Sequence, residues 1–71
     1  MREPETKEQK FLIDSIIADL ALYLVEDEGM TVNDALSTVY NSDYYNLLNN
    51  IDTELYIRGP LNNYHYLRRE L

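Results

Sequence analysis

The fold of this chain is decided by residues 11–25, which read FLIDSIIADLALYLV. Apolar side chains recur in this stretch at helical intervals of three and four residues, at Ile13, Ile16, Ile17, Leu20, Tyr23 and Leu24. Upstream, Thr6 followed by Gln9 has the spacing of a capping box, in which two side chains satisfy the first free amides of a helix. We therefore predict one long first helix over residues 6–27.

The other side of this first helix is only partly polar. Ser15, Asp19 and Glu26 indicate a solvent-facing side, but Leu22 lies among them. Four further residues widen the apolar surface beyond one stripe, namely Phe11, Ala18, Ala21 and Val25. We expect a helix that is exposed to water on one side only.

Two short helices are predicted next. Gly29 fits the left-handed residue that ends a helix, and Thr31 can cap a second helix that begins at Val32. Ser42 or Asp43 can cap a third. The second helix is expected to face the core with Val32, Ala35, Leu36, Val39 and Tyr40, and the third with Tyr44, Leu47, Leu48 and Ile51.

The C-terminal part of the sequence predicts a change of structure and then a last helix. Residues 52–59 read as a turn followed by a short extended piece, with Leu55 and Ile57 on one side and Tyr56 on the other. Pro60 is favoured in the first turn of a helix. We expect the last helix to bury one stripe, made of Pro60, Tyr64, Leu67 and Leu71.

These segments predict an all-α fold in a single small domain over residues 1–71. The bundle has one long and three short helices, with an extended or irregular connection near residues 51–59, and residues 1–5 are expected to be flexible. A chain of this size buries only about 60% of its unfolded surface, so its stability should be modest and self-association would help it. There is no cysteine, which excludes disulfides and thiolate metal sites.

Charge is the strongest compositional signal. The net charge is -7, and nine carboxylates but no lysine or arginine fall between Lys10 and Arg58. Such a surface repels phosphate backbones, so nucleic-acid binding is not expected. A basic protein partner would be attracted to it, although acidic residues also keep a small protein in solution. The polar residues within the 11–25 stretch argue against a signal peptide or membrane span, and we expect a cytoplasmic, bacterial protein.

Few residues are suited to catalysis or metal binding. His65 is the one histidine, and it lies between two tyrosines beside the stripe of the last helix, where a surface role is expected rather than that of a general base. Glu26, Asp27 and Glu28 form an acidic run, but neighbouring helical residues point in different directions and no spaced loop of oxygen ligands follows. We therefore predict no enzyme activity, no cofactor and no metal site.

Tyrosine is the unusual residue type, because six of the seven tyrosines fall between Tyr40 and Tyr66. Tyrosine is enriched at protein interfaces, where its ring buries area and its hydroxyl stays wet. Tyr40, Tyr44 and Tyr64 lie on predicted core stripes. The candidates for partner binding are the off-stripe tyrosines, the histidine beside them and the acidic run, namely Tyr45, Tyr56, Tyr66, His65, Glu26, Asp27 and Glu28.

Part of the chain resembles a known sequence pattern. Tyr40-Asn41-Ser42, Leu55-Tyr56, Pro60 and Tyr66-Leu67 followed by Glu70-Leu71 are similar to the YNS, LY, P and YLxxEL series of a family of small bacterial proteins of unknown function. The resemblance covers about residues 30–71. It implies a companion of toxin-like or other operon neighbours.

The function expected from the sequence is non-enzymatic protein binding, by an antitoxin-like or regulatory partner protein. Two other classes stay open. One is a DNA-binding regulator that uses the second and third helices as a helix-turn-helix, although no basic residue lies in the third helix. The other is a structural homo-oligomer, for example a homodimer, in which the tyrosines and residues 55–57 bury one another.

Overall fold

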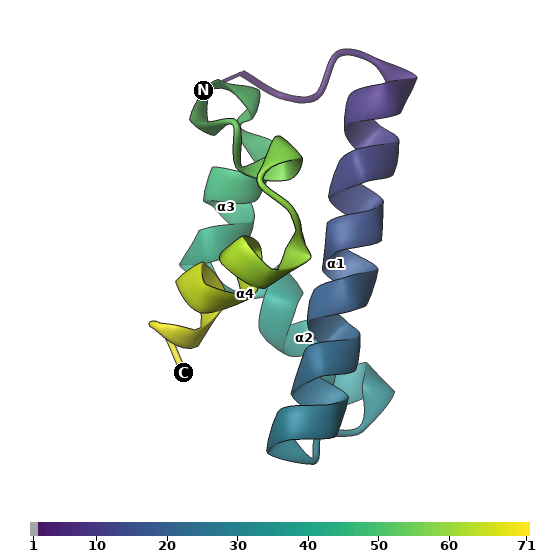
Figure 1. Cartoon of the computed structure of the whole chain (residues 1–71), viewed down its shortest axis with the longest axis vertical. Helices are drawn as coiled ribbons and strands as arrows, with labels where there is room; N and C mark the ends of the chain where they lie inside the picture. Colours follow the sequence, from purple (N-terminus) through teal and green to yellow (C-terminus); the bar gives the residue numbers. More distant parts are fainter. Residues whose placement is uncertain (1) are drawn as a thin grey trace.

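The computed structural model describes residues 2–71 and confirms the all-α fold (Figure 1). The elements follow one another as α1 (Lys7–Glu28), α2 (Val32–Tyr40), α3 (Asp43–Asn49), two 3₁₀ turns, η1 (Ile51–Thr53) and η2 (Leu55–Ile57), and α4 (Pro60–Arg68). Helix α1 runs along the longest dimension of the molecule, which is 34 Å, and the remaining elements pack against it.

The predicted helix ends are present as hydrogen-bonded caps. The Thr6 hydroxyl accepts from the Gln9 amide at 3.1 Å, and the Gln9 side chain accepts in turn from the Thr6 amide, which completes the capping box. Gly29 ends α1 in the left-handed conformation, with φ of 67°. The Thr31 hydroxyl caps α2 and the Ser42 hydroxyl caps α3. These caps explain why the chain changes direction where the sequence indicates.

The core lies between α1 and everything that packs on it. It includes the stripe that residues 11–25 predict, and it continues through the short helices and η2. The buried members are Ile13, Ile16, Ile17, Leu20, Ala21, Leu24, Ala35, Val39, Tyr44, Leu48, Leu55, Tyr64 and Leu67. Helix α1 therefore supplies nearly half of the side chains that hold the fold together.

Several residues expected in the core are exposed instead. Val32 is 59% exposed, Tyr40 50% and Leu47 48%, and Leu71 lies beyond the end of α4. Helices α2 and α3 are short, at 9 and 7 residues, and only part of the apolar stripe of each contacts the core. Their buried members are Ala35, Val39, Tyr44 and Leu48.

The prediction of an extended piece at residues 55–57 is wrong, because this segment forms the 3₁₀ turn η2. Within η2, Leu55 is buried and Ile57 is exposed, so the two do not share one side. Side chains stabilise the first turn, η1, where Asn50 Oδ1 accepts from the Asp52 amide at 3.2 Å and the Thr53 hydroxyl donates to the Asn50 carbonyl at 2.8 Å. The Thr53 hydroxyl also accepts from the Leu55 amide at 3.3 Å, at the start of η2. Local side-chain hydrogen bonds thus replace those that a strand would need from a partner.

The two turns are joined by Glu54, which has φ of 57° and ψ of 18°. This left-handed conformation is strained for a residue with a Cβ atom and is freely adopted by glycine. The Glu54 side chain is exposed, so it contributes little packing that would offset the strain.

The buried side chain of Asn63, on α4, joins three elements. Its Nδ2 donates to the Leu55 carbonyl of η2 at 2.8 Å and to the Gly59 carbonyl before α4 at 2.7 Å. Both amide protons are then used, so Oδ1 is the acceptor for the hydroxyl of Tyr44 on α3. Asn63 is fully buried, and its hydrogen-bonding groups all have partners within the protein.

Both chain ends are tied to the middle of the molecule. The Glu70 carboxylate accepts from the amides of Asp43 and Tyr44 at 2.8 and 2.6 Å, which places an anion at the positive end of α3. At the other end, the Arg2 carbonyl accepts from the Ile51 amide, and its guanidinium contacts Asp52 at 2.9 Å. The N-terminal segment therefore lies beside η1, where Figure 1 shows it crossing from the first residues to α1.

We predict that Asn63→Leu lowers the free energy of unfolding by about 3 kcal/mol, because it leaves the Tyr44 hydroxyl buried without a partner and removes one hydrogen bond from each of the Leu55 and Gly59 carbonyls, which keep only their backbone partners. Urea unfolding measures this change. The matched control is Asn62→Leu at the exposed neighbouring position, which should change stability by less than about 1 kcal/mol. An Asn63 variant as stable as its control would contradict the account of this hydrogen-bond network.

A second substitution should raise stability. Glu54→Gly relieves the left-handed strain and is expected to add about 1 kcal/mol. Glu54→Ala removes the same carboxylate but keeps the Cβ atom, so it should add nothing. A thermal midpoint that rises equally in both variants would attribute the gain to charge instead of to backbone conformation.

Candidate functional site

The most unusual surface of the molecule is an apolar groove between α1 and α2. Its lining is entirely apolar, and its volume is about 340 Å³. The α1–α2 groove, as we name it from here on, is lined by Ala18, Ala21, Leu22, Val25, Val32 and Leu36. The groove therefore exposes to solvent side chains of the kind that a folded chain normally buries.

Two residues account for most of this exposure. Leu22 projects from α1 and is 56% exposed, and Val32 projects from the first turn of α2 and is 59% exposed. Val25 and Leu36 lie deeper and pack partly against the core. The floor of the groove, Val25 and Leu36, thus contributes to the core, whereas the two rim residues, Leu22 and Val32, do not.

Phe11 extends this surface along α1. It is 70% exposed, which is the largest value among the large apolar side chains of residues 2–71. Phe11, Ala18, Leu22 and Val25 are spaced by seven, four and three residues, so their side chains lie on the same side of α1 within one narrow stripe. We call the α1–α2 groove together with Phe11 the apolar face.

The apolar face lies away from α4. Tyr23 of α1 contacts Tyr64 of α4, with 5.0 Å between ring centroids, and a helix places Tyr23 on a different side from Leu22 and Val25. Helix α1 is consequently covered by α4 on one side and by α2 on another, and the apolar face lies where α1 and α2 meet at the surface. The sequence shows this stripe as the widened apolar surface of residues 11–25, but it does not show which side α4 covers.

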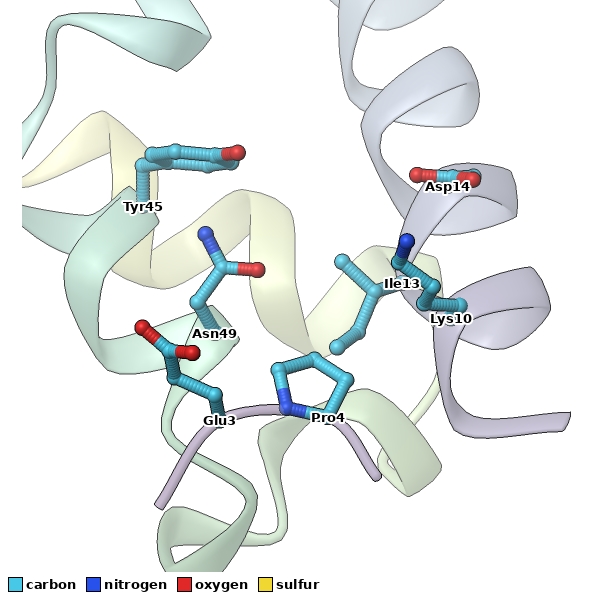
Figure 2. A pocket seen from close by; sticks show the side chains of 7 residues that line it. All are labelled: Glu3, Pro4, Lys10, Ile13, Asp14, Tyr45 and Asn49. Atoms are coloured by element: carbon cyan, nitrogen blue, oxygen red, sulfur yellow. The ribbon is translucent and has the colours of Figure 1, made fainter. Parts of the chain in front are cut away.

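A second hollow lies at the opposite end of α1, toward its N-terminus (Figure 2). It has a volume of about 410 Å³ and is bounded by the N-terminal segment, α1 and α3. Its lining residues are Glu3, Pro4, Lys10, Ile13, Asp14, Tyr45 and Asn49. Figure 2 shows Tyr45 reaching across from α3 toward the side of α1 that carries Asp14.

This second hollow is chemically mixed. It combines two carboxylates, one ammonium group, one amide and one phenol, and Glu3, Lys10 and Asp14 are exposed to solvent. Exposed charges of both signs bind a ligand weakly, because water competes for each contact. Its lining set also contains no histidine, serine or threonine that could pair a nucleophile with a base.

The structure separates the tyrosines that the sequence singles out as partner-binding candidates. Tyr45 is half-buried on α3, and its ring lies edge-on against that of Tyr40 at 5.2 Å. Tyr56 packs partly against the core from η2. Tyr66 is on α4, under the guanidinium of Arg69 at 5.2 Å. These tyrosines lie on three different elements, and no ring pair among the described residues joins them.

The remaining candidates lie at two further places. His65 is exposed in the last turn of α4, beside Tyr66 in the sequence. Glu26, Asp27 and Glu28 are exposed in the last turn of α1, which carries no basic residue, so the acidic run lies at the negative end of the helix dipole. Within residues 2–71, no three side chains of the His, Cys, Asp or Glu type come together as metal ligands.

Two buried tyrosines have perturbed acidity. Burial raises the pKa of the Tyr44 hydroxyl above its usual value of 10.0. The pKa of Tyr64 is also raised, first by burial and then by the nearby Asp27 carboxylate, while the guanidinium of Arg68 acts in the opposite sense. Both groups are structural, because Tyr44 bonds to Asn63 and Tyr64 packs in the core.

Comparisons with known proteins do not relate this chain to any of them. No protein-family model matches the chain, and no curated protein and no solved structure matches it. The family resemblance noted in residues 30–71 therefore stays a prediction.

None of the helices in residues 2–71 is long and apolar enough to cross a membrane.

The raised tyrosine pKa values predict the response of the protein to alkali. Above pH 10 the unfolded chain loses phenolic protons that the folded chain keeps, so the unfolded state binds fewer protons and stability falls as pH rises. Urea midpoints measured at pH 8 and pH 11 test this, and Tyr44→Phe should show a smaller difference between the two. An unchanged midpoint would contradict the assignment.

Proposed function

We propose that this chain is a non-enzymatic protein-interaction module that binds its partner through the apolar face. The observation that carries the proposal is the entirely apolar lining of the α1–α2 groove, with the exposed Phe11 about two helical turns away on the same side of α1. Contiguous exposed apolar surface is costly in water, and on small proteins it marks the sites where other proteins bind.

The chemistry of the remaining surface supports binding rather than catalysis. The one histidine, His65, is solvent-exposed on α4 and lies outside both hollows. General acid-base catalysis needs such a group beside a substrate in a site from which water is excluded. The α1–α2 groove is apolar, whereas the hollow near the N-terminus of α1 is an open mixture of charges, and the groove suits a side chain of another protein.

The charges around the apolar face suggest the character of the partner. Helix α2 carries Asp34, and the last turn of α1 carries Glu26 and Glu28, while no lysine or arginine lies in either the second half of α1 or α2. Asp27 lies on the other side of α1, near Tyr64 of α4. Like charges at an interface rim are repelled and opposite charges are steered together. A heterologous partner would therefore present apolar side chains flanked by lysine or arginine, and the antitoxin-like module we propose would bind a toxin-like protein of this kind.

DNA binding by α2 and α3 is the less favoured function. Helix α3 has no basic residue, its first residue is Asp43, and the Glu70 carboxylate occupies its N-terminus at 2.8 Å from the Asp43 amide. A phosphate group would meet negative charge at the position where a recognition helix normally attracts it.

We place the module in the cytoplasm, in keeping with its charge and its lack of cysteine.

Affinity capture tests the proposal with three forms of the tagged protein. The wild type should retain one stoichiometric protein from an extract of its source organism, and Leu22→Glu should reduce that recovery at least about tenfold by placing a charge on the groove rim. Leu61→Glu is the matched control, because Leu61 is equally exposed at 60% but projects from α4.

The test depends on which variants still recover the partner. A partner lost with Leu22→Glu and kept with Leu61→Glu supports binding at the apolar face. Recovery that is equal in all three forms, or lost only with Leu61→Glu, contradicts the proposal. Circular dichroism of each form checks that the helices are intact.

A further inference from the structure

The apolar face has a self-complementary arrangement. Phe11 projects seven residues before Ala18, and Val25, on the floor of the α1–α2 groove, lies seven residues after it. At 1.5 Å per residue, each feature is about 10 Å from Ala18 along the helix. A two-fold axis through Ala18 therefore places the Phe11 side chain of each copy over the groove of the other.

We infer that a second copy of this chain occupies the apolar face, with the two α1 helices antiparallel and crossing at Ala18. This inference rests on the proposed function, since the second copy occupies the same face and would leave it when a heterologous partner binds there. In this arrangement each copy contributes its α1 and α2 to one four-helix bundle, with the two α1 helices at the centre. The contact is isologous, because the same surface of each copy takes part in it. It therefore produces a closed dimer and cannot extend into a filament.

The size of the side chains along α1 fits this crossing. The central positions Ser15 and Ala18 are small, so the backbones of two helices can approach closely there. The large Phe11 lies at the outer end of the stripe, opposite a groove whose walls, Leu22 and Val32, are more than half exposed. Protruding and hollow surfaces thus alternate with the same spacing in both copies.

The charges of α1 select the antiparallel direction. Its N-terminal turns, residues 7–14, carry Lys7 and Lys10 together with Glu8 and Asp14 and are neutral, whereas its C-terminal turn carries Glu26, Asp27 and Glu28 without a basic residue. A parallel pair would bring two acidic runs together. The antiparallel pair places the neutral end of each helix beside the acidic end of the other and opposes the two helix dipoles.

Self-association also explains how so short a chain can leave this face apolar. With 71 residues and no cysteine, the protein has only its helical core for stability. Burial of Phe11, Leu22, Val25, Val32 and Leu36 against a second copy would enlarge that core.

Cysteine cross-linking tests both the contact and its direction, and the absence of native cysteine makes each variant unambiguous. Ala18→Cys places one thiol of each copy at the two-fold axis, and oxidation should give a covalent dimer. Leu22→Cys is the matched control: in the antiparallel pair its two copies are about eight residue rises, or 12 Å, apart, which exceeds the reach of a disulfide.

The outcomes separate this inference from the proposed function. Cross-linking of Ala18→Cys alone, together with a dimeric mass in light scattering that Phe11→Ala weakens at least about tenfold and Leu61→Ala does not, is the expected result. Cross-linking of both cysteine variants indicates a parallel pair and overturns the inference. A monomeric mass at millimolar concentration also overturns it, and the proposed function then stands or falls on the capture of a different protein at Leu22.

Discussion

The structure depends on the buried side chain of Asn63. A chain with so few residues has little apolar surface with which to fix the position of its last helix, and α4 follows two 3₁₀ turns that contain no regular ladder of hydrogen bonds. The Asn63 amide satisfies two carbonyls of this irregular segment and receives the hydroxyl of Tyr44. Because an unpaired amide in this position would be costly, these hydrogen bonds favour the observed placement of α4 relative to α3 and η2.

This placement of α4 determines which surface remains free. Once α4 packs against α1 through Tyr64 and Leu67, one side of α1 is covered, and α2 is too short to cover the rest. The apolar residues that α1 carries beyond its core stripe are then left at the surface as the apolar face. A single constraint inside the protein thus accounts for the apolar face outside it.

The sequence predicts those features that depend on neighbouring residues. The capping box of Thr6, the left-handed Gly29, the cap by Ser42 and the helical position of Pro60 are local, and each is confirmed. The features that depend on distant contacts were not predicted. Residues 55–57 were expected to be extended because their alternation suits a strand, whereas the structure satisfies the Leu55 carbonyl with Asn63, eight residues further along.

The candidate site also separates features that depend on neighbouring residues from features that depend on distant contacts. Tyrosine content predicts partner binding at Tyr45, Tyr56 and Tyr66, but burial and position are set by packing, which distributes these residues over α3, η2 and α4. Tyr40 was expected in the core and is half exposed, because α3 turns away from the end of α2 and leaves it beside Tyr45. The apolar face could have been found from the spacing of Phe11, Ala18, Leu22 and Val25, once that stripe is recognised as separate from the core stripe of α1.

The most direct measurement of the central claim is an isotope-filtered nuclear Overhauser experiment on an equal mixture of labelled and unlabelled protein, which reports only contacts between copies. The account predicts intermolecular signals from the ring of Phe11 to the methyl groups of Val25, Val32 and Leu36. Intermolecular signals confined to Ile57 and Leu61 beside α4, with none from Phe11, would contradict it.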